Sequence, residues 1–365
     1  MAGSSFGTIF RITTWGESHG SAIGVVVDGV PSGLSLCEED IQIFLDRRKP
    51  GQSKYTTKRN ESDSVQILSG TFEGRTTGTP ISMAVFNQDQ HSRDYSEIAA
   101  CYRPGHADFT FDAKYGFRDY RGGGRSSGRE TIGRVAAGAI ASKLLKELGI
   151  SVTAYTRSIG SVTMESFDPE EINKNPFSFP DADAAKKASS LVEDAMAKCD
   201  SMGGIIECVV KGMPSGVGDP VFEKLDANLA KALMSIGAVK GVEIGDGFSV
   251  AHATGLSNND EFYIEENGII AKRTNHAGGI LGGISDGSDL VVRAAIKPTP
   301  SVASLQHTVN REGENIDIQI KGRHDPIIVP RAVVVVECMT ALVLADALLV
   351  GMSSRLDNVK KIWKP

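Results

Sequence analysis

The sequence has few cysteines, and their spacing argues against two classes of protein. Five cysteines are scattered along the 365 residues without a C-x-x-C pair, namely Cys37, Cys101, Cys199, Cys208 and Cys338. Disulfide-stapled scaffolds and zinc clusters need cysteines in a closely spaced framework. No H-E-x-x-H pair occurs either, so we expect free thiols and no metal site. The N-terminal stretch resembles neither a signal peptide nor a transit peptide, and we expect the protein to be cytoplasmic.

Positive charge is in deficit over the chain as a whole. Lysine and arginine together number 39 against 45 acidic residues, which gives a formal net charge of −6. General nucleic-acid binding and attachment to anionic membranes both depend on a summed positive field. We therefore expect neither partner, and any basic site must be local.

Long apolar runs are also rare, and only residues 331–352 approach the length of a membrane span. Glu337 and Asp346 lie inside this run, and unpaired carboxylates are costly in lipid. Pro330 suits the first turn of a helix, and Gly351 suits its end. The run is therefore predicted to be a buried helix rather than a membrane segment.

Strand-like and helix-like segments alternate along the chain. Helical patterns occur at residues 38–48, 131–149, 181–199 and 220–237, and strand patterns at residues 22–30, 203–213, 289–298 and 316–322. The mixture indicates an α/β or α+β fold. Long polar, glycine-rich connections are candidates for functional loops, at residues 50–63, 102–129 and 275–287. Residues 165–180 are expected to form a solvent-exposed insertion.

The stretch YRGGGRSSGRETIGRV, residues 120–135, combines glycines, arginines and serines directly before a helical pattern. It nearly matches a Walker A loop, but Arg129 and Glu130 stand where a lysine and a hydroxyl residue belong. The dinucleotide fingerprint fails as well, because no apolar strand precedes the loop. Backbone N–H groups at a helix start beside guanidinium groups still suit a phosphate or a carboxylate. The alternative is a flexible surface loop.

A second basic cluster is RRKPGQSKYTTKR, residues 47–59, which contains no acidic residue. A solvated basic loop is one explanation of such a run. Together with the glycine-arginine loop, the cluster could instead form one wall of a pocket for a multiply anionic small molecule.

Three histidines lie in glycine-rich or charged surroundings. They are His19 in GESHG, His106 in RPGHAD and His324 in GRHDP. An imidazole can pass a proton near neutral pH, although each could equally be a structural histidine. GESHG also has the letters of a G-x-S-x-G nucleophile elbow around Ser18. That motif needs a strand before it and a helix after it, and the following residues read as a strand.

Several segments, taken in order along the chain, resemble the chorismate synthase family. They are GESHG, GVVVDGVPSGL, RRKPGQSKYTTKR, ILSGTFEGRTTGTPI, RPGHADFTFDAKYGFRDYRGGGRSSGRET, NHAGGILGGISDG, KPTPS and RHDPIIVPRA. The resemblance covers residues 13–346. It implies an α+β fold, a β-α-β sandwich with mixed helices and mainly antiparallel sheets, in a single domain of residues 1–365. It also implies a lyase that eliminates phosphate from 5-enolpyruvylshikimate 3-phosphate to give chorismate, the last step of the shikimate pathway towards aromatic amino acids.

The same resemblance implies reduced FMN as cofactor without net redox change, and a homotetramer. NADPH would act only indirectly, because we expect an external flavin reductase. The implied substrate-binding residues are Arg48, Lys54, Arg129 and Arg323. The implied FMN-binding residues are Arg125, Ser126, Ser127, Gly237, Ala238, Gly282, Lys297, Pro298, Thr299, Pro300, Ser301 and Arg323.

Three residues are implied to be catalytic. His19 would neutralise charge on the departing phosphate, His106 would lie near the pyrimidine end of the flavin, and Asp325 would relay a proton with flavin N5. Lys54 and Gly237 depart from the arginine and asparagine common in the family, so their contacts are less defined. Rival readings are an ATP-dependent phosphotransferase that uses the near-Walker loop, and an anion- or RNA-binding scaffold.

Overall fold

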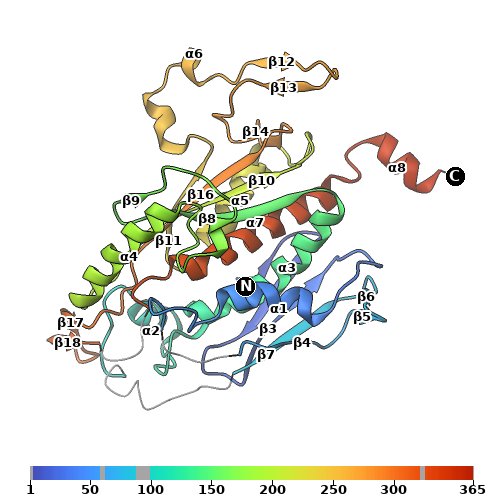
Figure 1. The fold of residues 1–365 in the computed structure, drawn as a ribbon. Coiled ribbons are helices and arrows are strands. Elements are labelled where there is room, and N and C mark those ends of the chain that lie inside the picture. Colours follow the sequence, from blue (N-terminus) through green and yellow to red (C-terminus); the bar gives the residue numbers. More distant parts are fainter. Residues whose placement is uncertain (1–2, 58–61, 88–98, 321–324, 365) are drawn as a thin grey trace.

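The computed structural model describes residues 3–57, 62–87, 99–320 and 325–364. Two five-stranded sheets, both built from antiparallel pairs, enclose a layer of helices (Figure 1). The first has the order β1-β2-β3-β7-β4 and comprises β1 (Ser5–Phe6), β2 (Arg11–Gly16), β3 (Ala22–Asp28), β7 (Ile81–Phe86) and β4 (Val65–Ile67). The second has the order β11-β16-β10-β8-β9 and comprises β11 (Val239–Ile244), β16 (Leu290–Ile296), β10 (Gly204–Lys211), β8 (Ser151–Ile159) and β9 (Val162–Thr163).

The central layer consists of α1 (Glu38–Arg48), α3 (Thr131–Glu147), α5 (Leu225–Met234) and α7 (Val329–Gly351). Helix α3 packs on β2, β3 and β7 of the first sheet, whereas α7 packs on β8 and β10 of the second. The two helices also pack against each other, and one cluster of buried apolar residues runs through the whole sandwich. The expected α+β fold, a β-α-β sandwich, is confirmed. The assignment of residues 1–365 to a single domain stays a prediction.

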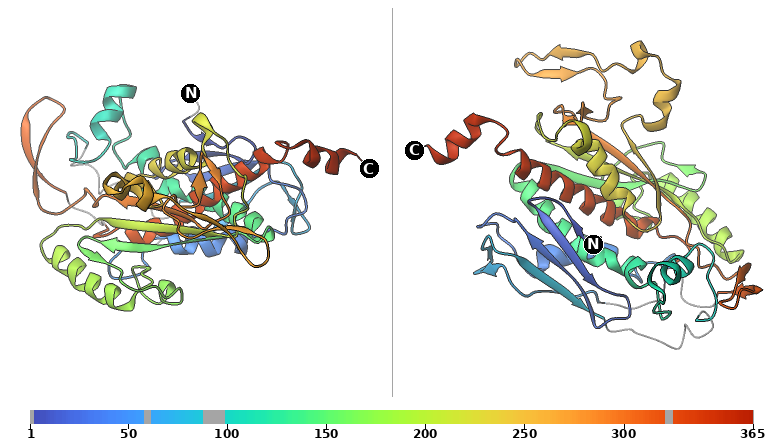
Figure 2. Two further views of the ribbon diagram at one scale, coloured as in Figure 1. Left: turned by 90° about the horizontal axis from the view of Figure 1, so that it is seen from above. Right: turned by 180° about the vertical axis from the view of Figure 1, so that it is seen from behind.

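Smaller elements extend from this body (Figure 2). The two-stranded pairs are β5 (Thr71–Phe72) with β6 (Arg75–Thr76), β12 (Phe262–Ile264) with β13 (Ile270–Lys272), β14 (Ile280–Leu281) with β15 (Ile284–Ser285), and β17 (Leu305–Val309) with β18 (Asn315–Gln319). The remaining helices are α2 (Asp108–Tyr115), α4 (Ala182–Ala197), α6 (Gly255–Asn258) and α8 (Leu356–Trp363). Helix α8 projects away from the sandwich at the C-terminus.

Helix α7 is the apolar run that approaches the length of a membrane span. Among the described residues it is the one helix long and apolar enough for that role, and it lies largely buried between the sheets. Both of its carboxylates have partners. Glu337 accepts hydrogen bonds from Arg47 Nη1 at 2.6 Å and from the backbone of Ala154 at 3.0 Å, and Asp346 accepts from three backbone N–H groups of residues 8–10. The prediction of a buried helix is confirmed.

The expected solvent-exposed insertion at residues 165–180 is wrong for its second half. Phe177 and Phe179 are fully buried, and the backbone of Ser178 accepts a hydrogen bond from Thr156 of β8. Tyr55 also packs on Phe177, with ring centroids 4.7 Å apart. Because the two phenylalanines bury large apolar surfaces, they anchor the segment to the second sheet.

Replacing Arg47 should be more harmful than removing the whole ion pair with Glu337. The Glu337 side chain is 7% exposed and that of Arg47 is 35% exposed, so Arg47→Met leaves an uncompensated buried carboxylate. We expect this variant to lose about 3–5 kcal/mol of unfolding free energy. The double variant Arg47→Met with Glu337→Gln should recover at least half of the loss in urea denaturation. Simple additivity of the two single changes would contradict this account.

Candidate active site

The GESHG segment forms a tight turn between β2 and β3. The N–H of Gly20 donates to the carbonyl oxygen of Glu17 at 3.1 Å, so that Ser18 and His19 occupy the two corners of the turn. The strand-turn-strand setting differs from that of a nucleophile elbow, which leads into a helix. Ser18 Oγ is buried without a hydrogen-bond partner among the described residues.

The glycine-arginine loop lies directly against this turn. A Cβ added to Gly122 would stand 2.5 Å from Cδ2 of His19, so only a glycine allows the two segments to approach this closely. Two short 3₁₀ turns, Gly124–Ser126 and Gly128–Glu130, lead from the loop into α3. Arg125 donates to the carbonyl oxygen of Gly16 at 3.0 Å. Its guanidinium therefore holds the loop to the end of β2.

Two of the expected substrate-binding arginines meet at a buried carboxylate. Arg48 Nη2 lies 2.5 Å from Asp63 Oδ2, and Arg129 Nη1 lies 3.1 Å from Asp63 Oδ1. The side chains of Arg48, Asp63 and Arg129 are 1%, 0% and 6% exposed. Arg48 Nη1 also donates to the carbonyl oxygen of Gly128 at 3.1 Å, which joins the basic run to the glycine-arginine loop.

Burial lowers the pKa of Arg48 to about 10, although the nearby Asp63 carboxylate opposes this shift. The guanidinium consequently keeps its proton at neutral pH. Arg129 and Arg331 also act to lower the pKa of Arg48, because three like charges stand close together. Asp63 adopts a left-handed backbone conformation with φ 46°, which is unusual for a residue with a side chain.

Asp325 belongs to the same cluster. Its carboxylate accepts hydrogen bonds from the backbone of Thr57 at 2.8 Å and from Arg331 Nη1 at 2.6 Å. Arg331, in the first turn of α7, also donates to the carbonyl oxygen of Arg48 at 3.0 Å. Three guanidiniums and two carboxylates leave one net positive charge, which suits an anionic ligand.

His106 lies beside the KPTPS segment, residues 297–301. His106 Nδ1 is 3.0 Å from the carbonyl oxygen of Pro104, and Nε2 is 2.8 Å from Ser301 Oγ. Because a carbonyl oxygen only accepts, Nδ1 carries a proton, whereas either atom can donate in the bond between Nε2 and the serine hydroxyl. Lys297 donates to the carbonyl oxygen of Gly105 at 2.9 Å. The backbone of Lys297 in turn bonds to Ala238, so the segments 104–106, 237–238 and 297–301 meet.

An open cavity of about 370 Å³ adjoins the KPTPS segment. Its lining includes Gly160, Gly203, Gly204 and Pro298. Because three of these residues have no side chain, backbone atoms form part of the cavity surface. Thr299 Oγ1 is buried without a hydrogen-bond partner among the described residues. A ligand beside this segment could satisfy that hydroxyl group.

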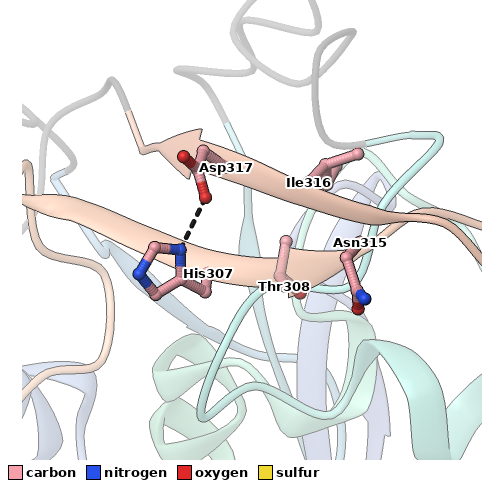
Figure 3. A pocket seen from close by; sticks show the side chains of 5 residues that line it. All are labelled: His307, Thr308, Asn315, Ile316 and Asp317. Atoms are coloured by element: carbon pink, nitrogen blue, oxygen red, sulfur yellow. Dashed lines mark hydrogen bonds and ion pairs between the residues drawn. The ribbon is translucent and has the colours of Figure 1, made fainter.

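A second hollow, of about 440 Å³, lies over the β17–β18 hairpin (Figure 3). His307 Nδ1 and Asp317 Oδ1 face each other across the strands at 2.6 Å. The His307 side chain is 89% exposed, and the lining contains none of the residues expected from the sequence. We assign this hollow no part in the site.

Several expected residues lie apart from these groups. Lys54 Nζ pairs with Glu193 of α4 at 2.7 Å, and its side chain is 70% exposed; hydrogen bonding to Glu193 raises the pKa of Lys54. Gly282 lies in the β14–β15 hairpin, which precedes β16, whereas Lys297 directly follows the end of that strand. Arg323 and His324 fall outside the described residues. The binding and catalytic roles of all the expected residues, including Lys54, Gly282 and Arg323, stay predictions.

Three residues of the site escaped the sequence-based analysis, namely Asp63, Asn87 and Arg331. Asn87 Oδ1 accepts from Arg129 Nη2 at 2.7 Å. Asp63 ends the loop at residues 50–63 and Arg331 lies in the RHDPIIVPRA segment, but neither was given a role, and Asn87 lies in no segment singled out from the sequence. The one available signal was the acid that follows a basic run, which could have suggested Asp63 as a counter-charge.

Comparisons with known proteins bear on the family to which the chain belongs. Residues 10–349 match the sequence model of a family described as chorismate synthase. Proteins of that name from Agathobacter rectalis and Lachnospira eligens are 68% and 65% identical, with 100% of each chain covered. A solved structure titled "Crystal Structure of Chorismate Synthase" superposes with a TM-score of 0.77 at 32% identity, covering 98% of this chain and 96% of that one.

The Asp63 carboxylate should contribute far more to stability than a comparable surface carboxylate. Asp63→Asn leaves two buried guanidiniums without their shared counter-charge, so we expect a loss of about 3–5 kcal/mol in unfolding free energy. Glu193→Gln is the matched control, because it removes the charge of the exposed pair with Lys54 while its amide oxygen can still accept from the Tyr55 hydroxyl, and it should cost at most about 1 kcal/mol. Urea denaturation of both variants measures the difference. Equal losses would show that Asp63 is not the counter-charge described.

Proposed function

Because this chain belongs to the chorismate synthase family, we propose that it converts 5-enolpyruvylshikimate 3-phosphate into chorismate. In this elimination, the bond between the ring and the phosphate oxygen breaks, a ring C–H bond breaks, and a new ring double bond forms. The reaction would be an anti-1,4-elimination that needs reduced FMN and has no net redox change. Family membership makes the protein an enzyme, and the proposal specifies its reaction.

The observation that carries the proposal is the buried group of Arg48, Arg129 and Arg331 around Asp63 and Asp325. The substrate carries one phosphate and two carboxylates, so it needs a cationic site in a chain whose net charge is −6. Arg129 would bind a substrate anion, with Arg48 behind it. Charge-assisted hydrogen bonds from guanidinium groups suit phosphate and carboxylate oxygens.

Three further side chains would handle protons. His19, at the corner of its turn, would neutralise the charge that develops on the departing phosphate. Asp325 would relay the proton that leaves the ring, and its carboxylate is held in place by Thr57 and Arg331. His106 would provide a proton-bearing group near the cofactor, with Nδ1 bonded to the carbonyl oxygen of Pro104 and Nε2 to Ser301.

The residues beside the KPTPS segment fit a flavin phosphate and ring. The observation that tests this fit is the buried Thr299 hydroxyl without a partner among the described residues, which directly follows Pro298 in the lining of the open cavity. Lys297, Thr299 and Ser301 would hold the cofactor, together with Ser126 and Ser127 of the glycine-arginine loop. When bound, reduced FMN would supply a transient electron to the substrate ring and regain it within the same turnover.

We further propose a cytoplasmic homotetramer that receives reduced flavin from an external reductase. Exposed apolar side chains on protruding elements support an assembly of several copies, because such surfaces are usually covered by a partner. Phe262 and Ile264 of β12 are 60% and 74% exposed, and Trp363 of α8 is 80% exposed.

The reaction itself is tested under anaerobic conditions. Purified protein is mixed with the enolpyruvyl substrate and chemically reduced FMN, and chorismate and free phosphate are followed together. We expect equal amounts of both products. Oxidised FMN alone should give neither, so activity under that condition would contradict the cofactor requirement. In a parallel assay with ATP and Mg²⁺, ATP consumption without chorismate formation would instead favour a phosphotransferase.

A methyl group at Gly122 should displace His19 and slow the reaction. A Cβ there would stand 2.5 Å from His19 Cδ2, whereas one at Gly128 in the same loop would meet no atom within 4 Å. We expect Gly122→Ala to lower kcat about 100-fold, because small misplacements of a catalytic group are costly. Gly128→Ala is the control and should stay within about threefold of the wild type. Similar kcat values for both variants would remove His19 from the proposed role.

A further inference from the structure

Asn87 follows β7 and holds both ends of the turn that carries His19. Its Nδ2 donates to the carbonyl oxygen of Glu17 at 3.1 Å and to that of Gly20 at 2.8 Å. The N–H of Gly20 closes the same turn by donating to the carbonyl oxygen of Glu17 at 3.1 Å. The backbone N–H of Asn87 also donates to the carbonyl oxygen of Ser21 at 3.1 Å. The turn is therefore fixed both by its own hydrogen bond and by the asparagine side chain.

The other half of the Asn87 amide binds Arg129. Oδ1 accepts from Arg129 Nε at 3.2 Å and from Nη2 at 2.7 Å. A guanidinium can only donate and a carbonyl oxygen can only accept, so the orientation of the amide follows from its neighbours. With two hydrogen bonds donated and two accepted, its hydrogen-bonding capacity is filled. The same guanidinium faces Asp63 at 3.1 Å, so its direction is set from two sides.

We propose that Asn87 is a positioning residue that couples the His19 turn to Arg129. The proposal rests on the function proposed above, in which Arg129 binds a substrate anion and His19 neutralises the departing phosphate. Because one planar amide bonds to both segments, it keeps the guanidinium of Arg129 and the turn that carries the imidazole of His19 at a constant distance and orientation. Such a constraint matters because a displacement of about 1 Å at a reacting group can cost about 100-fold in rate.

The matched control is Asn175, whose amide has the same pattern of hydrogen bonds in another part of the molecule. Its Nδ2 donates to the carbonyl oxygens of Glu171 and Phe179, and its Oδ1 accepts from the N–H groups of Phe177 and Phe179. Both asparagines are half-buried. Asn87→Ala and Asn175→Ala therefore remove the same number of hydrogen bonds, but only the first change touches the candidate site.

Asn87→Asp distinguishes the contact with Arg129 from the contacts with the turn. The carboxylate can still accept from Arg129, but it directs an oxygen instead of N–H groups at the carbonyl oxygens of Glu17 and Gly20. It should therefore release the turn while it keeps the contact with Arg129. Its added charge should also compete with the substrate for Arg129 and raise KM.

The experiment compares the full-length wild-type protein with Asn87→Ala, Asn87→Asp and Asn175→Ala in three measurements. These are steady-state kinetics with reduced FMN, amide hydrogen exchange of residues 16–22 without ligands, and thermal unfolding. We expect Asn87→Ala to lower kcat about 100-fold, to raise KM about tenfold, and to accelerate exchange in the turn. Asn87→Asp should accelerate exchange and lower kcat similarly. Asn175→Ala should match Asn87→Ala in its loss of Tm but keep kcat, KM and the exchange of the turn.

Two outcomes would overturn the role of Asn87. One is wild-type kinetics in Asn87→Ala, and the other is a loss of activity in Asn175→Ala as large as that in Asn87→Ala, since the effect would then follow stability alone. Wild-type protein that forms no chorismate would overturn the proposed function itself, and with it the catalytic meaning of the coupling. The exchange measurement would still show whether Asn87 holds the turn, so the two failures are distinguishable.

Discussion

The carboxylate of Asp63, shared between two buried guanidiniums, is the interaction on which the candidate site depends. Burial lowers the pKa of Arg48 to about 10, and without a nearby anion the cost of enclosing Arg48 and Arg129 together would be severe. Asp63 makes this concentration of positive charge compatible with a folded protein. The cluster keeps one net positive charge once Arg331 and Asp325 are included, so its preference for anions survives the neutralisation.

The helix layer brings these charges to one place. Helix α1 ends at Arg48, α3 begins at Thr131, two residues after Arg129, and α7 begins at Val329, two residues before Arg331. The central helices pack against one another, so the loops at these ends converge. The sandwich thus supplies rigid supports, and the glycine-rich segments between them supply the close approach that His19 and Gly122 require.

Periodicity in the sequence was sufficient for part of the regular elements, although β2, β7 and β8 were not predicted and the helix expected at residues 220–237 is shorter, α5 at Leu225–Met234. The predicted helix at residues 38–48 coincides with α1, and the apolar run with two carboxylates is α7, because apolar stripes and end signals are local properties. Arg48, Arg129 and Asp325, which the resemblance implied for the site, lie in one cluster of ion pairs, and their roles stay predictions. Asp63, Asn87 and Arg331 were not predicted, since each acts through a partner that is distant in the sequence. The burial of Phe177 and Phe179 depends on β8 in the same way.

The basic run at residues 47–59 illustrates why charge patterns need the fold for their interpretation. The run holds no acid of its own, yet four of its cations are paired in the folded chain: Arg47 with Glu337, Arg48 with Asp63, Lys49 with Asp46 and Lys54 with Glu193. These acids come from α7, from the segment before β4, from α1 and from α4. Of the four cations, Arg48 alone is bonded to the glycine-arginine loop among the described residues. A ligand anion would therefore be selected by a few guanidiniums held in fixed directions, and the summed charge of the run contributes little to that selection.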